Sequence, residues 1–181
     1  MKIFYSNPYR TDKNIGGAYN EFIKSLNAND EDWIVLQDGD MMFLTPDWGQ
    51  RIEDALALDG NNYGLIGCYT NRIKSSCQLH EGVISEDFNI KNHYEIALGY
   101  TGKGIEEVKK QVIAGFFMAF QYKTGKKVGG FTPNNISCDA IFNSKVREAG
   151  LKVGLIRSLY VFHVYRMWAE KEPWNERKHL K

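Results

Sequence analysis

An uninterrupted apolar run, Trp33-Ile34-Val35-Leu36, constrains the fold of this 181-residue chain more than any other feature. A run of strand length without polar alternation is typical of a strand that is buried on both faces. Helices on both sides of a sheet bury strands in this way, so the run predicts a central strand of an α/β domain. It leads directly into the acidic turn Asp38-Gly39-Asp40.

The rest of the chain alternates between strand-like and helix-like segments. We expect strands at 2–5, 33–36, 63–69, 112–122, 152–156 and 159–163, and helices at about 17–26, 45–59, 104–110 and 137–149. Thr45 and Ser137 are the expected helix caps. Residues 70–110 are interpreted as a variable insertion and 167–181 as a charged C-terminal tail. No internal repeat interrupts the pattern, so residues 1–181 are predicted to form one domain with a mostly parallel mixed sheet flanked by helices.

Bulk properties exclude several classes of partner. The formal net charge is +1, so no global field favours nucleic acid or an anionic membrane, and we expect no nucleic-acid partner. No apolar run approaches about 18 residues, which predicts no transmembrane segment. Residues 1–5 do not resemble a signal peptide. Three cysteines without metal-like spacing suit a reducing compartment, so a cytoplasmic location is expected.

The acidic turn is the clearest candidate for a functional site. Open α/β sheets bind ligands beyond the carboxyl ends of their strands, where Asp38 and Asp40 are expected to lie. Two nearby carboxylates repel each other unless a cation lies between them. A divalent metal supplies that cation, and a nucleotide diphosphate completes its oxygen shell. The alternative is an ordinary surface turn, because Asp-Gly is a common turn dipeptide. The apolar segments 33–36 and 41–44 on either side favour a functional site over a surface turn.

Three matches, at 14–20 with 33–40, at 128–131 with 138–139, and at 160–163, occur in an order that resembles GT-A fold glycosyltransferases, and glycosyltransferase family 2 in particular. Residues 14–20 and 33–40 are similar to the family's Asn-x-Gly helix and the strand that ends in its Asp-x-Asp motif. Residues 128–131, with Cys138-Asp139 after them, resemble its Gly-Gly-Phe segment and the acceptor-side acid that opens the next helix. Residues 160–163 resemble the late segment whose histidine joins the metal.

The resemblance implies a metal-dependent, inverting glycosyltransferase that acts in polysaccharide biosynthesis. It would move a sugar from a nucleotide-diphosphate sugar, with a UDP-sugar expected, to a glycan, a lipid-linked glycan or another hydroxyl acceptor. Asp38 would face the ribose and the metal shell, and Asp40 and His163 would coordinate the metal. A mixed oxygen and imidazole shell favours Mn²⁺ over Mg²⁺. Asp139 would be the general base that takes the proton of the acceptor hydroxyl.

The remaining donor contacts are expected from four residues. By resemblance, Asn14 and Gly16 belong to the donor site. Arg72 is a candidate contact for the donor or the acceptor, and Arg166 is a candidate cation for the leaving diphosphate. The alternative for Arg166 is a solvated surface arginine, and the alternative for Arg72 is an ordinary polar loop. Two further functions remain open. One is a non-catalytic glycan or nucleotide-sugar binding protein, and the other is a sugar nucleotidyltransferase, although residues 6–11 do not form the Gly-rich phosphate loop of that class.

Overall fold

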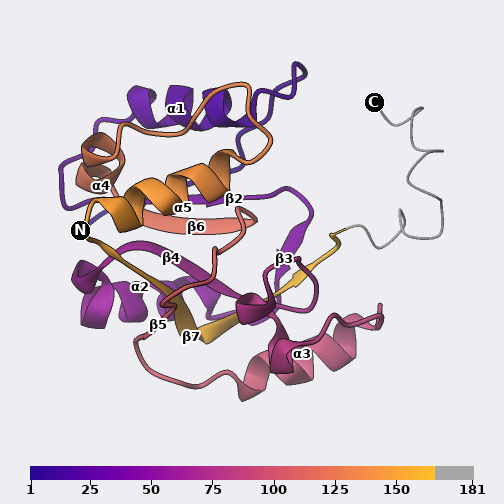
Figure 1. Ribbon diagram of the computed structural model, residues 1–181. Coiled ribbons are helices and arrows are strands. Elements are labelled where there is room, and N and C mark those ends of the chain that lie inside the picture. Colours follow the sequence, from indigo (N-terminus) through magenta and orange to yellow (C-terminus); the bar gives the residue numbers. More distant parts are fainter. Residues whose placement is uncertain (166–181) are drawn as a thin grey trace.

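The computed structural model describes residues 1–165, and Arg166 and the tail 167–181 lie outside the described residues. A seven-stranded mixed sheet is flanked by helices on both faces, with α1, α4 and α5 on one side and α2 on the other (Figure 1). The strands are β1 (Ile3–Ser6), β2 (Trp33–Gln37), β3 (Met41–Phe43), β4 (Tyr63–Thr70), β5 (Ile105–Glu107), β6 (Phe117–Gln121) and β7 (Lys152–His163). The helices are α1 (Ile15–Ser25), α2 (Trp48–Asp59), α3 (Ile90–Gly99), α4 (Tyr122–Lys127) and α5 (Cys138–Glu148), with 3-10 turns at Gly60–Asn62, Ser76–Gln78 and His80–Gly82.

The sheet has the order β1-β2-β6-β4-β7-β3, and β5 also pairs with β7. The α/β class is confirmed, but the expectation of a mostly parallel sheet is wrong. Only β1–β2 and β4–β7 run parallel, and the other four pairings are antiparallel. The physical reason is that a strand buried on both faces is apolar at every position whichever way it runs. The apolar runs therefore reveal burial but not strand direction.

The predicted central strand is confirmed, and it divides the core into two layers. Trp33 and Val35 of β2 pack on the α2 side, whereas Ile34 and Leu36 pack on the α1 and α5 side. All four side chains are at most 1% exposed. Side chains of a strand alternate between the two faces, so a strand between two helical layers must be apolar throughout. Burial of this kind stabilises the fold by about 1.5–3 kcal/mol for each large side chain.

Two elements differ from the sequence expectation in the region 70–110. The expected helix at 104–110 is wrong, because Ile105–Glu107 forms β5 and pairs with β7. Gly104, whose φ is +69°, turns the chain there and leaves Ile105 buried beside two exposed glutamates. The helix lies instead at Ile90–Gly99. Part of this region therefore contributes a strand, β5, to the sheet.

Smaller differences occur at strand and helix ends. The two strands expected near the C-terminus form one strand, β7, with a register shift around Arg157 where β4 and β7 lose regular pairing. The strand expected at 112–122 is shortened to Phe117–Gln121. Asp47, not Thr45, is the N-cap of α2, and Ser137 caps α5 by position without a side-chain hydrogen bond. Among the helices of residues 1–165, none combines the length and apolarity needed to cross a bilayer.

Candidate metal centre

The turn Asp38-Gly39-Asp40 links two strands that are not neighbours in the sheet. It leaves β2 and enters β3, which pairs with the end of β7 so that Met41 lies opposite His163. Backbone hydrogen bonds hold both ends of the turn: Asp38 N–H donates to the Phe116 carbonyl at 2.9 Å, and Val164 N–H donates to the Asp40 carbonyl at 2.9 Å. The turn therefore spans the end of the sheet between β2 and β3. It places Asp40 beside His163, the last residue of β7.

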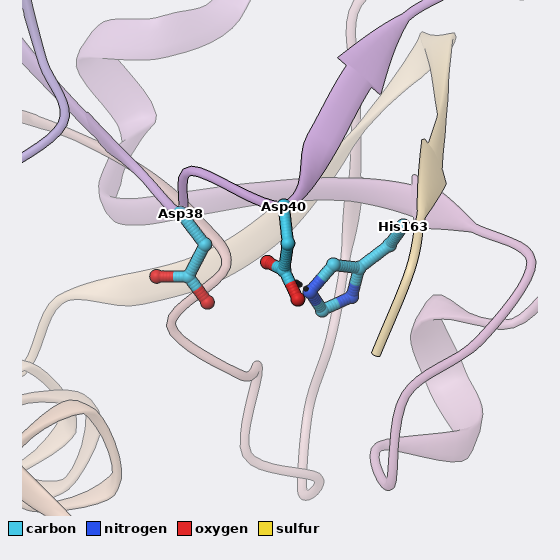
Figure 2. A group of neighbouring side chains, drawn as sticks. All are labelled: Asp38, Asp40 and His163. Carbon is cyan, nitrogen blue, oxygen red and sulfur yellow. Dashed lines mark hydrogen bonds and ion pairs between the residues drawn. The ribbon is translucent and has the colours of Figure 1, made fainter. Parts of the chain in front are cut away.

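This crossing brings three potential ligands together. His163 Nε2 lies 3.2 Å from Asp40 Oδ1, although the two residues are 123 positions apart. Figure 2 shows the Asp40 and His163 side chains pointing toward one another, with Asp38 on the same side of the turn. The three ligand atoms all lie within 4.8 Å of one another. The expected closeness of His163 to Asp40 is confirmed, whereas metal binding by the group stays a prediction.

The tautomer of His163 follows from its second hydrogen bond. Nδ1 lies 3.1 Å from the backbone carbonyl of Arg72, which can only accept, so Nδ1 carries a hydrogen. In the neutral ring, Nε2 then presents a lone pair to the Asp40 carboxylate, which also presents lone pairs. Two such groups attract each other only through a cation, which is either a proton on Nε2 or a metal ion.

The separation of the Asp40 and His163 ligand atoms fits a divalent cation. Two ligand atoms bound at about 2.1 Å and at a right angle are roughly 3 Å apart, close to the observed separation of Nε2 and Oδ1. Two carboxylates and a neutral imidazole form a mixed oxygen and nitrogen set that suits Mn²⁺ and also allows Mg²⁺. The Arg72 carbonyl orients the imidazole in the way that outer contacts orient metal-binding histidines. The residues present therefore fit the metal that the resemblance implies.

The imidazole is held rigidly from several sides. His163 is 1% exposed, and its ring stacks on Phe116 with centroids 4.9 Å apart and an interplanar angle of 22°. Its backbone N–H donates to Oδ1 of the buried Asn71 at 2.7 Å. Tyr165 packs against the same ring at 5.6 Å. A ring fixed in this way loses little conformational freedom when it binds an ion.

The two carboxyls of the turn have opposite electrostatic surroundings. The hydrogen bond from His163 lowers the pKa of Asp40 below its ordinary value. Burial raises the pKa of Asp38, and the neighbouring Asp40 and Asp139 carboxylates raise it further, while His163 acts in the opposite direction. Charge on Asp38 is thus less favourable than on a carboxyl in water. A cation placed between the carboxyls would reverse that preference.

Asp139 lies on the same cavity as Asp38 and His163. This cavity has a volume of about 470 Å³ and is also lined by residues of α1, α5 and the loops after β4 and before β6. Asp139 Oδ2 accepts the Gly115 N–H at 2.9 Å, and Oδ1 accepts the Ala140 N–H at 2.8 Å. The carboxylate therefore attaches the loop before β6 to the start of α5. A carboxylate oxygen can accept more than one hydrogen bond, so both Asp139 oxygens have capacity for a further donor.

Arg72 has a different position from the one expected for a donor-binding cation. Its side chain is 1% exposed. The guanidinium donates to the Tyr165 carbonyl at 2.8 Å, to the Ser85 carbonyl at 3.2 Å and to Glu86 at 2.9 Å. Two chain segments, residues 85–86 and the end of β7 with Tyr165 after it, thus bury this side chain, and donor contact by Arg72 stays a prediction. Arg72 supports the centre through its carbonyl, which accepts from His163.

The structure also gives Asn14 and Gly16 packing roles, and their donor contacts stay predictions. Asn14 Oδ1 accepts the Gly17 N–H at 2.9 Å and the Asn134 N–H at 2.8 Å, so it caps α1 and ties it to the loop before α5. A Cβ on Gly16 would lie 2.3 Å from the Thr132 carbonyl oxygen, which explains why this position has no side chain. The remaining expected cation, Arg166, lies outside the described residues.

One residue of the cavity was missed by reasoning from the sequence. Lys74, in the loop after β4, is exposed and lines the cavity together with Asp38 and Asp139. A single lysine in a polar stretch has no periodicity or spacing that marks it as functional. Its position supplies a positive charge at the rim of a cavity that holds two carboxyls, where an anionic ligand would need one.

The fold and the site define an α/β protein with a candidate divalent-metal centre at the edge of its sheet. A scan against models of known protein families finds no match for this chain, and a search of curated proteins finds none either.

Proposed function

We propose that the chain is a metal-dependent glycosyltransferase of the GT-A type, which moves a sugar from a nucleotide-diphosphate sugar to an acceptor hydroxyl with inversion. One observation carries the proposal: Asp38, Asp40 and His163 converge on one point beside a cavity. The acidic turn and the late histidine are the motifs on which the family resemblance rests. That they meet in space supports the resemblance as more than a coincidence of short sequences.

The proposed metal site is held by this chain's own side chains. Asp38, Asp40 and His163 would hold Mn²⁺ or Mg²⁺, which when bound supplies positive charge against the diphosphate that leaves the sugar. Lys74 adds a cation at the rim of the cavity. The cavity volume of about 470 Å³ lies within the range of roughly 300–1,000 Å³ that small-molecule sites occupy. A UDP-sugar is the proposed donor, and a glycan, lipid-linked glycan or other hydroxyl compound is the acceptor.

Asp139 is the proposed general base. It lies on the same cavity as Asp38, and its carboxylate is held in place by the N–H groups of Gly115 and Ala140. A carboxylate fixed at the cavity wall accepts the acceptor's proton while the acceptor oxygen attacks the anomeric carbon. General bases contribute about 10²–10⁴-fold to turnover.

The test is release of UDP with Mn²⁺ from UDP-glucose, UDP-galactose and UDP-N-acetylglucosamine. We expect at least one donor to be turned over, Asp40→Asn to abolish the metal-dependent release, and Glu53→Gln to leave it unchanged. Glu53 is an exposed acid on α2 and serves as the matched control. If Mn²⁺ and UDP bind together but no donor is turned over, the non-catalytic binding protein replaces the transferase. Release that persists in Asp40→Asn would contradict the proposed site.

A further inference from the structure

A second hollow lies beside β7, away from the candidate metal centre. It has a volume of about 420 Å³ and is lined by the end of α3, the loop 99–102 and residues of β4, β5 and β7. Tyr160 of β7 packs beneath it, and His163 lies three positions further along the same strand. Residues an odd number of positions apart point to opposite faces of a strand, so the hollow and the metal centre lie on opposite faces of β7. They are separate sites.

The floor of the hollow consists of fixed aromatic rings. The Tyr69 and Tyr100 rings have centroids 5.0 Å apart, and Tyr100 stacks on the buried Tyr160 at 5.3 Å with an interplanar angle of 25°. The hydroxyl of Tyr100 is 3.0 Å from Nδ1 of His80, and the hydroxyl of Tyr69 donates to Glu106 at 3.0 Å. Both upper rings are only partly buried. Tilted 47° to each other, they form an apolar platform with hydrogen-bonding groups at its border.

The rim of the hollow carries one acid and one base. Glu106 is exposed and lies at the border beside Tyr69. Arg157 lies against Gly102, where an added Cβ would be 2.9 Å from Arg157 Cβ and 3.2 Å from its Nε. Within residues 1–165 the Arg157 guanidinium makes no hydrogen bond or ion pair. Its donors and the Glu106 carboxylate therefore face the same space as the two rings.

We propose that this hollow is a binding site for a neutral oligosaccharide. The apolar face of a hexopyranose ring packs on an aromatic platform, and its adjacent hydroxyls donate to a carboxylate and accept from a guanidinium. Glu106 and Arg157 balance each other in charge, so the hollow has no field that would select a phosphate or another anion. Its volume lies within the range of roughly 300–1,000 Å³ typical of small-molecule sites.

This inference goes beyond the proposed function, because the bound sugar is not the reacting one. Tyr160 and His163 are about 10 Å apart along β7, at roughly 3.3 Å per residue, but on opposite faces. A glycan chain in the hollow is held on the protein and not aligned with the metal centre. Binding there requires neither the metal nor the nucleotide.

The test measures binding of cellohexaose, maltohexaose and chitohexaose by saturation-transfer difference NMR, in EDTA and without nucleotide. We expect saturable binding of at least one of the three. Arg157→Ala and Glu106→Gln should each weaken it roughly fivefold or more, since each removes a charge-assisted hydrogen bond. Lys103→Ala, an exposed cation in the neighbouring turn that does not line the hollow, should bind as the unmodified protein does.

The two altered side chains are exposed, so equal melting temperatures are expected and would show that the fold is kept. Absence of binding by all three sugars, or unchanged binding in both Arg157→Ala and Glu106→Gln, would overturn the proposal. The result is separable from the proposed transferase activity. If this hollow is the sugar site, the Asp40→Asn variant loses UDP release but still binds the oligosaccharide in EDTA. A protein that fails to bind the oligosaccharide can still release UDP.

Discussion

Replacing Asp139 with asparagine tests whether this residue acts in chemistry, in structure or in both. Its two carboxylate oxygens accept the N–H groups of Gly115 and Ala140 at 2.9 and 2.8 Å. The asparagine amide has a single oxygen, so one of these N–H groups must face an NH₂ and lose its acceptor. A hydrogen bond to a charged group contributes about 1.5–3 kcal/mol, and we expect the free energy of unfolding to fall by that amount. If Asp139 is also the general base, turnover falls by about 10²–10⁴-fold.

Two assays separate these effects. Urea unfolding followed by tryptophan fluorescence measures stability, since Trp33 is buried in the core. UDP release, measured where the variant is fully folded, gives turnover. Ser144→Ala is the control, because Ser144 is exposed on the same helix and should change stability by less than about 0.5 kcal/mol. Near-normal turnover in a destabilised Asp139→Asn protein would refute the catalytic role, and unchanged stability would refute the structural one.

Two further predictions concern packing and thiol chemistry. Gly16→Ala should lower the free energy of unfolding in urea by about 1–3 kcal/mol, since its Cβ would lie 2.3 Å from the Thr132 carbonyl oxygen. Gly49→Ala, whose Cβ would meet nothing within 4 Å, should not destabilise, and an equal loss in both variants would contradict the packing account. Burial raises the pKa of Cys138 to about 11, so iodoacetamide at pH 8 should label the partly exposed Cys77 first. Labelling of Cys138 should accelerate as the pH rises from 8 to 10 and its thiolate fraction grows, and equal labelling of both at pH 8 would refute this prediction.

The parts of the fold that sequence predicts well are those in which burial dictates residue type. The run Trp33–Leu36 had to be apolar at every position, because helices cover both faces of β2. The helix α3 gave no such signal. One of its buried positions is His93, which is 1% exposed because its ring nitrogens bond the Tyr160 hydroxyl at 2.7 Å and the Asp87 carbonyl at 2.9 Å. A buried polar side chain with full hydrogen bonding breaks the apolar period on which helix prediction depends.

The candidate site was predictable in its motifs but not in its supporting contacts. The sequence marks Asp38, Asp40 and His163 through strand ends and family resemblance. It contains no sign that Arg72 would be buried by contacts with two distant segments, or that its carbonyl would set the tautomer of His163. Such contacts depend on how distant loops converge, and no local pattern of residue types encodes that. Lys74 escaped notice for the same reason.

The most direct test of the metal centre is a Mn²⁺ titration in which electron paramagnetic resonance counts the free ion, with and without UDP. We expect one bound Mn²⁺ per chain, tighter binding when UDP is present, and a loss of affinity of at least about 10–100-fold in His163→Gln. Glu53→Gln should bind Mn²⁺ as the unmodified protein does. Equal Mn²⁺ binding by His163→Gln and the unmodified protein, or no response to UDP, would contradict the assignment of Asp38, Asp40 and His163 as a metal and diphosphate site.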